Sequence, residues 1–198
     1  MMWLYRVGWP VVWVFTKLFF RLKIVRQAPL PQGPVILCCN HFHMLDPLNT
    51  AMITRRQVFY MAKKELFEHK FVGWLITHLG AFPVDRNNND VSSMRKSLAL
   101  LKEGKILGIY PEGTRSKDGQ VHAFHSGAAM FALRTGAALV PVGFSNPYKL
   151  GKKVKMLVGA PMDISDFAGH KPTSEDIQRL NTRLRETVIA LCEQARSL

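Results

Sequence analysis

A histidine and an aspartate five positions apart, His41 and Asp46, carry the clearest chemistry in this 198-residue sequence. On a continuous helix their side chains would lie roughly 140° apart, so only a turn can bring them together. Pro47 favours a helix that begins here, with Asp46 as its cap. Such a turn would fold the carboxylate onto the imidazole, fix its tautomer and leave the second ring nitrogen as a base for a substrate hydroxyl. The alternative is that Asp46 only caps the helix and His41 only packs.

Two further polar blocks follow predicted strands and have the residue types that bind a phosphate. Arg86 ends residues 80–86, where its planar guanidinium is placed to hold a phosphate; a solvated surface arginine is the alternative. Within residues 110–116, Gly113 lets the backbone approach a ligand closely. The backbone N–H groups, hydroxyls and Arg115 of this block favour an anion cradle, although a plain surface turn has the same composition.

A fourth block, residues 139–144, is apolar and contains Pro141 in an otherwise strand-like run. A proline without an N–H group is typical of a sheet edge. Pro141 is therefore a candidate for the wall of an acyl pocket or for a sheet edge, and a plain core strand is the alternative.

The charge of the chain predicts an anionic partner. Lys and Arg number 27 against 14 acidic residues, a formal net charge of +13, which attracts nucleic acid, anionic lipid or a phosphorylated ligand. The basic residues are spread along the chain without a nucleic-acid-binding motif, so we expect no nucleic-acid partner. Three cysteines without a C-x-x-C pair predict a reducing compartment, no disulfide framework and no metal site.

Short apolar runs alternate with helical patterns, which predicts a single α/β domain over residues 28–198. Because the apolar runs are continuous, both faces of the central sheet should be covered by helices, and the sheet should be mostly parallel or mixed. Asp90, Gly136 and Thr173 mark predicted helix ends. The predicted strands are residues 34–39, 57–62, 81–85, 105–110, 138–144 and 154–159.

The first 27 residues form a separate segment. Trp3, Trp9 and Trp13 lie in an apolar stretch that Lys17 interrupts and a basic flank follows. The uninterrupted run is shorter than the roughly 20 residues a spanning helix needs. Tryptophan beside basic residues favours a helix in the lipid headgroup layer, and an ordinary core helix is the alternative.

The four blocks, in this order, resemble the glycerolipid acyltransferase family that includes the 1-acyl-sn-glycerol-3-phosphate (lysophosphatidic acid) acyltransferases. That family is marked by N-H-x4-D, G-x-x-[FIL]-x-x-R, [FY]-P-E-G-T-R-S and a V-P-V-like stretch. All four occur here between residues 40 and 144. The resemblance implies an α/β sheet flanked by helices and an N-terminal segment docked on the bilayer.

The resemblance also implies roles for individual residues. His41 is the general base and Asp46 its orienting partner. Lys64 lies in a Lys-Glu-Leu element and is a weaker phosphate candidate, with Lys63 as its rival. The other residues implied to bind the phosphate of the acceptor are Arg86, Glu112, Gly113, Thr114 and Arg115.

The implied reaction moves a fatty-acyl group from acyl-CoA or acyl carrier protein to the sn-2 hydroxyl of 1-acyl-sn-glycerol 3-phosphate, without a metal or organic cofactor. We expect a peripheral or monotopic enzyme on the cytoplasmic face of the cell membrane. Glycerol 3-phosphate or another lysophospholipid is the alternative acceptor, and Cys39 is an alternative, acyl-carrying nucleophile. A non-enzymatic basic protein that binds nucleic acid or membrane is the more distant reading.

Overall fold

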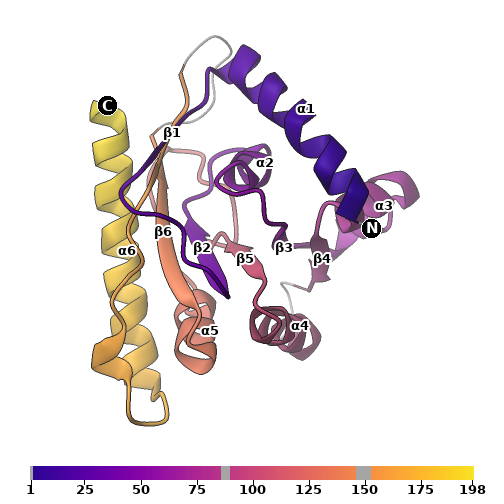
Figure 1. Cartoon of the computed structure of the whole chain (residues 1–198). Helices are drawn as coiled ribbons and strands as arrows, with labels where there is room; N and C mark the ends of the chain where they lie inside the picture. Colours follow the sequence, from indigo (N-terminus) through magenta and orange to yellow (C-terminus); the bar gives the residue numbers. More distant parts are fainter. Residues whose placement is uncertain (1, 86–89, 146–152) are drawn as a thin grey trace.

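The computed structural model describes residues 2–85, 90–145 and 153–198. Within them, seven apolar strands form one mixed sheet in the order β1-β7-β6-β2-β5-β3-β4 (Figure 1). The predicted α/β class and mixed sheet are confirmed. The strands are β1 (Lys23–Arg26), β2 (Val35–Cys39), β3 (Val58–Lys63), β4 (Ala81–Val84), β5 (Ile106–Ile109), β6 (Ala138–Phe144) and β7 (Lys155–Val158).

The pairing of the strands brings the polar blocks to one edge of the sheet. Strand β2 lies between β5 and β6 and is parallel to both, and β3 is parallel to β5 and β4. Parallel neighbours end at the same edge, so the segments that follow β2, β3, β4 and β5 gather there. Strand β7 runs antiparallel to β6 and parallel to β1.

Helices cover both faces of the sheet, as the continuous apolar strands require. Helices α1 and α2 pack on one face, and α4, α5 and α6 pack on the other. The helices are α1 (Met2–Phe20), α2 (Asp46–Ala51), α3 (Lys70–His78), α4 (Val91–Lys102), α5 (Gly127–Thr135) and α6 (Ser174–Ser197), with short 3₁₀ turns η1 (Lys64–Phe67) and η2 (Ser165–Phe167).

The predicted helix ends are confirmed. The Asp90 carboxylate accepts hydrogen bonds from the first-turn N–H groups of Ser92 and Ser93 in α4, and Gly136 ends α5 in the left-handed conformation. Thr173 and Asp176 form a capping box at the start of α6. These ends depend on residues within one turn of each other, which is why the sequence predicts them.

The N-terminal segment differs from the expectation of one helical unit over residues 1–27. Helix α1 ends at Phe20, and Lys23–Arg26 joins the sheet as β1 beside β7. The N–H of Lys23 donates to the carbonyl of Val154 at 2.9 Å, and Val154 donates to Phe20 at 3.0 Å. In the sequence, Lys23 and Arg26 look like a basic flank of the preceding helix. Only the pairing with β7 shows that they are the two ends of a strand. None of the described helices has the length and hydropathy needed to cross a bilayer.

Candidate active site

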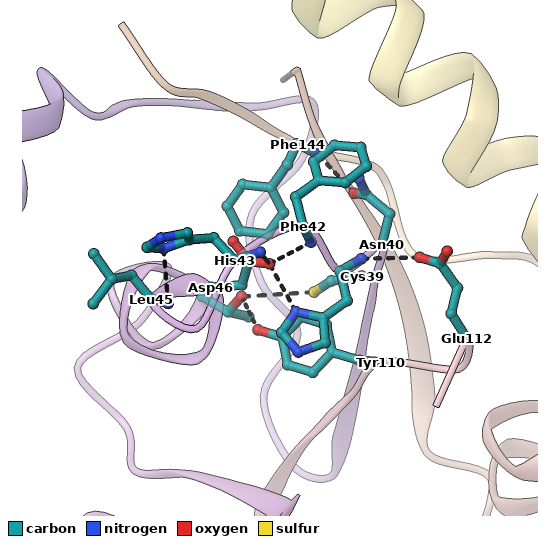
Figure 2. A network of polar contacts seen from close by, with 11 residues as sticks. Cys39, Asn40, Phe42, His43, Leu45, Asp46, Tyr110, Glu112 and Phe144 are labelled. Carbon is teal, nitrogen blue, oxygen red and sulfur yellow. Dashed lines mark hydrogen bonds and ion pairs between the residues drawn. The ribbon is translucent and has the colours of Figure 1, made fainter. Parts of the chain in front are cut away.

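The side chains of His41 and Asp46 meet at the carboxyl end of β2. Nδ1 of the imidazole lies 2.8 Å from Oδ2 of Asp46. The same carboxylate oxygen accepts the backbone N–H groups of Phe42 and His43, each at 2.7 Å (Figure 2). Asp46 is 0% exposed, so these three donors compensate for the loss of water around its charge. The predicted fold-back of the carboxylate onto the imidazole is confirmed.

This geometry fixes which nitrogen of His41 can act as a base. An ionised carboxylate only accepts hydrogen bonds, so Nδ1 carries the proton and Nε2 is left to accept one. The His41 side chain is 15% exposed, which gives a ligand access to it. Its ring lies on Tyr110, with centroids 4.4 Å apart, and the Tyr110 hydroxyl bonds to Thr50 of α2 at 2.8 Å. The arrangement is suited to removing a proton from a hydroxyl group.

The prediction that Asp46 caps its helix is wrong. The N-cap of α2 is Leu45, and Asp46 is the first helical residue, followed by Pro47. Its side chain makes no cap hydrogen bond because it turns back to the three N–H groups of the preceding loop. The Asp46 carboxylate therefore bonds to the loop that contains His41 and not to the first turn of α2.

The turn after β5 holds the backbone of His41 from both sides. Oε1 of Glu112 accepts the His41 N–H at 2.9 Å (Figure 2). The Ser116 N–H donates to the His41 carbonyl at 2.8 Å. Oε2 of Glu112 accepts the N–H of His122 at 3.0 Å. Glu112 is 7% exposed. Both of its oxygens bond to the protein, and its charge repels a phosphate, so its contacts are those of a positioning residue and not of a phosphate ligand.

The remaining residues of this turn form its exposed tip. Gly113 has φ of +70° and its N–H donates to the Tyr110 carbonyl at 3.0 Å, so it shapes the turn. A side chain at this position would also approach the imidazole of His125, with Nε2 only 3.1 Å from a Cβ. Thr114 and Arg115 are exposed at the tip. The anion cradle stays a prediction, and Thr114 and Arg115 are the residues of this turn that are exposed to a ligand.

Lys64, another predicted phosphate residue, lies on the far side of the same edge. Arg86 lies outside the described residues. Lys64 follows β3, and its Nζ lies 2.6 Å from Oδ2 of Asp85 at the end of β4. This pairing raises the pKa of Lys64 and keeps it protonated. Lys63 pairs with Glu65 at 3.3 Å. Strand β5 lies between β2 and β3. The two lysines, which follow β3, are therefore separated from His41, which follows β2, by the width of one strand.

Pro141 is not at a sheet edge. It lies in β6, between β2 and β7, where its carbonyl accepts the N–H of Gly159 at 2.9 Å. Residues two apart in a strand point to the same face of the sheet. Gly143 faces Leu191 of α6, so Pro141 also points to the face that α6 covers. A cavity of about 340 Å³ beside it is also lined by charged Asp163 and Arg183. The structure therefore places Pro141 on the opposite face from α2 and the Asp46 carboxylate.

Cys39 does not have the environment of a nucleophile. It is fully buried, and its Sγ lies 3.8 Å from the hydroxyl of Thr50. Burial raises the pKa of its thiol well above the usual value, so the reactive thiolate is disfavoured. The acyl-carrying alternative is therefore not supported.

Sequence reasoning missed several contacts of the site. The ring of Tyr110 packs against the His41 imidazole. In the sequence, Tyr110 is only the aromatic residue that begins the third block, and nothing there indicates this contact. His43 is half-buried, its Nδ1 accepts the Leu45 N–H at 3.3 Å, and its ring lies 6.5 Å from that of Phe20. No local pattern predicts the contacts with Tyr110 and Phe20, because they depend on how α1 and β5 pack.

The chain is similar to known acyltransferases in sequence, and its fold matches that of one of them. A family model described as Acyltransferase matches residues 21–145. A 1-acyl-sn-glycerol-3-phosphate acyltransferase of Bacillus subtilis is 36% identical over 83% of this chain and 87% of its own length. One from Streptococcus pneumoniae is 32% identical over 86% of this chain and 65% of its own length. The crystal structure of the 1-acyl-sn-glycerophosphate (LPA) acyltransferase PlsC from Thermotoga maritima matches with a TM-score of 0.74 and 23% identity, over 98% of this chain and 82% of that one.

The first prediction concerns the base. We expect His41→Ala to lower kcat for acyl transfer from a thioester donor by about 10²–10⁴-fold, the usual contribution of a positioned general base. The fold should be retained, but the melting temperature should fall, because the buried Asp46 carboxylate loses one of its three donors. His69→Ala, which removes an exposed histidine before α3, is the matched control and should keep full activity. Wild-type turnover by the His41 variant would remove this residue from catalysis.

The second prediction concerns Glu112. A glutamine has one acceptor oxygen, so Glu112→Gln leaves the N–H of His41 or His122 facing an amide donor, at a cost of about 1–3 kcal/mol. We expect kcat to fall and the kcat-pH profile to shift, with little change in KM for the acceptor. Asp166→Asn alters an exposed carboxylate of η2, outside this turn, and serves as the control. A rise in KM with unchanged kcat would instead place Glu112 in acceptor binding.

Proposed function

Because this chain belongs to the acyltransferase family, we propose that it transfers a fatty-acyl group to the sn-2 hydroxyl of 1-acyl-sn-glycerol 3-phosphate and forms phosphatidic acid. The observation that carries the proposal is the 2.8 Å contact between Nδ1 of His41 and Asp46, which leaves Nε2 as a base at the rim of the sheet. The names of the relatives from Bacillus subtilis and Streptococcus pneumoniae support the acceptor.

The proposed chemistry is a single acyl transfer without a covalent enzyme intermediate. Nε2 of His41 takes the proton of the acceptor hydroxyl while its oxygen attacks the thioester carbonyl of acyl-CoA or acyl carrier protein. The carbon–sulfur bond then breaks, and the imidazolium returns the proton to the leaving thiolate. Asp46 stabilises the imidazolium through the Nδ1 hydrogen bond. Every proton is accounted for by one histidine, so the proposal includes neither a metal nor an organic cofactor.

The phosphate of the acceptor is proposed to bind at the tip of the turn after β5. Thr114 and Arg115 are exposed there, directly before Ser116, whose N–H donates to the His41 carbonyl. Arg86 and Lys64 are proposed as further phosphate contacts, and Lys64 directly follows β3. Binding the phosphate away from the reacting hydroxyl uses remote binding energy to orient that hydroxyl toward the base.

A lipid surface is the proposed location of the acceptor, on the cytoplasmic face of the cell membrane. Four residues of α1 with helical spacing form an outward apolar stripe: Val7, Val11, Val14 and Leu18, the last 71% exposed. Helix α3 adds Phe71, 74% exposed, and Trp74, whose rings stack 6.4 Å apart. Exposed apolar stripes beside basic residues favour the headgroup layer, which makes the protein peripheral or monotopic.

An assay of acceptors tests the proposed reaction. We expect purified protein to acylate 1-acyl-sn-glycerol 3-phosphate more efficiently than glycerol 3-phosphate or lysophosphatidylcholine, with product masses as the readout for both donor types. Arg115→Gln should raise KM for this acceptor about tenfold or more, because a charge-assisted phosphate contact is lost. Arg134→Gln, on the far face of the molecule, is the control. A preference for glycerol 3-phosphate would replace the proposed acceptor, and no transfer to any of the three would refute the proposed reaction.

Vesicle sedimentation tests the membrane surface. Val11→Glu together with Leu18→Glu should weaken binding to anionic vesicles more than tenfold, because burial of each apolar side chain contributes about 1.5–3 kcal/mol. Val91→Glu changes a half-exposed valine at the start of α4 and should leave binding unchanged. Equal binding by the double variant and the wild type would refute docking through α1.

A further inference from the structure

A basic cavity of about 330 Å³ lies between α1, β1 and the residues that follow α2. Its lining contains three cationic side chains, Lys17, Arg26 and Arg55, and two indoles, Trp9 and Trp13. The other lining residues are Ile24, Met52, Ile53 and Thr54, so the lining contains no carboxylate. The cavity lies beside the last turn of α2, whereas Asp46 and the catalytic turn lie at its first.

The walls of this cavity are held by specific contacts. Trp9, Trp13 and Lys17 are four residues apart, so they lie above one another on one flank of α1. Nε1 of Trp9 donates to the carbonyls of Ala51 at 3.3 Å and Thr54 at 3.1 Å. The Arg26 guanidinium donates to the Ile53 carbonyl at 2.8 Å. These bonds tie α1 and β1 to the end of α2 and give the cavity a defined shape.

The charge of the cavity is not neutralised by the protein. In residues 2–85, 90–145 and 153–198, the ion pairs involve none of Lys17, Arg26 and Arg55. Lys17 places its Nζ 5.8 Å from the centroid of the Trp13 ring, a contact that leaves its charge uncompensated. Three cations around one cavity without a carboxylate favour an anionic ligand.

The position of the cavity on α1 indicates where that anion comes from. The indole and lysine flank lies roughly a third of a turn around the helix from the stripe of Val7, Val11 and Leu18. If the stripe enters the bilayer, the flank faces the headgroup layer, where indole rings and basic side chains are favoured. Phospholipid phosphates surround the cavity there at high local concentration.

We propose that this cavity binds the phosphate headgroup of an anionic membrane phospholipid, at a site separate from the catalytic edge. The three cations contact the phosphate, and Trp9 and Trp13 pack against the glycerol. The inference rests on the proposed docking of α1 at a membrane, but not on the proposed acyl transfer. A lipid held there would fix the rotation of α1 relative to the bilayer.

Vesicle binding by the full chain tests the proposal. Lys17→Gln combined with Arg55→Gln removes two cations and leaves Arg26, which bonds to Ile53. Each cation near an anionic surface contributes about 1 kcal/mol, so binding to equimolar phosphatidylcholine and phosphatidylglycerol vesicles should weaken about 30-fold. Lys102→Gln with Arg134→Gln removes the same charge from the opposite face and should change binding less than about twofold. An equal loss in both double variants would show diffuse attraction and overturn the site.

A soluble ligand distinguishes a headgroup site from a general anion site. Titration with dihexanoyl-phosphatidylglycerol below its micelle concentration should shift the indole N–H NMR signals of Trp9 and Trp13 saturably in the wild type. The same shifts should be lost in the Lys17→Gln, Arg55→Gln variant. Saturation of the shifts by inorganic phosphate at equal concentration would make the site one for free anions, and unchanged indole signals would refute binding. Neither readout requires turnover, so both stay informative if the proposed acyl transfer fails.

Discussion

The candidate active site depends on one buried carboxylate, that of Asp46. Oδ2 of Asp46 is bonded to the imidazole of His41 and to two backbone N–H groups of the turn between them. A buried charge is tolerated only where such donors surround it. Because all three donors belong to the same short turn, the contacts that fold the turn also select the tautomer of the base. The conformation of this loop and its chemistry cannot be separated.

Two distant segments hold that turn against the sheet. Strand β5 pairs with β2, so the loop after β5 reaches the His41 backbone through Glu112 and Ser116. On the other side, α1 packs over α2, with Trp9 bonded to the carbonyl of Ala51. Helix α2 begins with the Asp46 carboxylate and ends beside the basic cavity. The proposed membrane helix and the turn between His41 and Asp46 are therefore attached to opposite ends of one short helix.

Much of the fold could be predicted because its signals are local. The continuous apolar runs predicted every strand except β1, within about two residues at each end, since buried parallel strands leave no alternation to misread. The helix ends at Asp90, Gly136 and Thr173 were also predictable, because capping contacts join residues within one turn. Strand β1 was missed because a four-residue edge strand with basic ends becomes recognisable only when β7 pairs with it.

By itself, the sequence determined the fold class, the order of the polar blocks and the pairing of His41 with Asp46, because each depends on near neighbours in the chain. Only the tertiary structure decided what Glu112, Pro141 and Lys64 contact. Glu112 accepts a hydrogen bond from the His41 backbone, and Lys64 forms an ion pair with Asp85. Pro141 lies inside the sheet, on the face that α6 covers. The physical reason is that a hydrogen bond or an ion pair between separate loops depends on which strands are adjacent, and no local pattern of residues records the strand order.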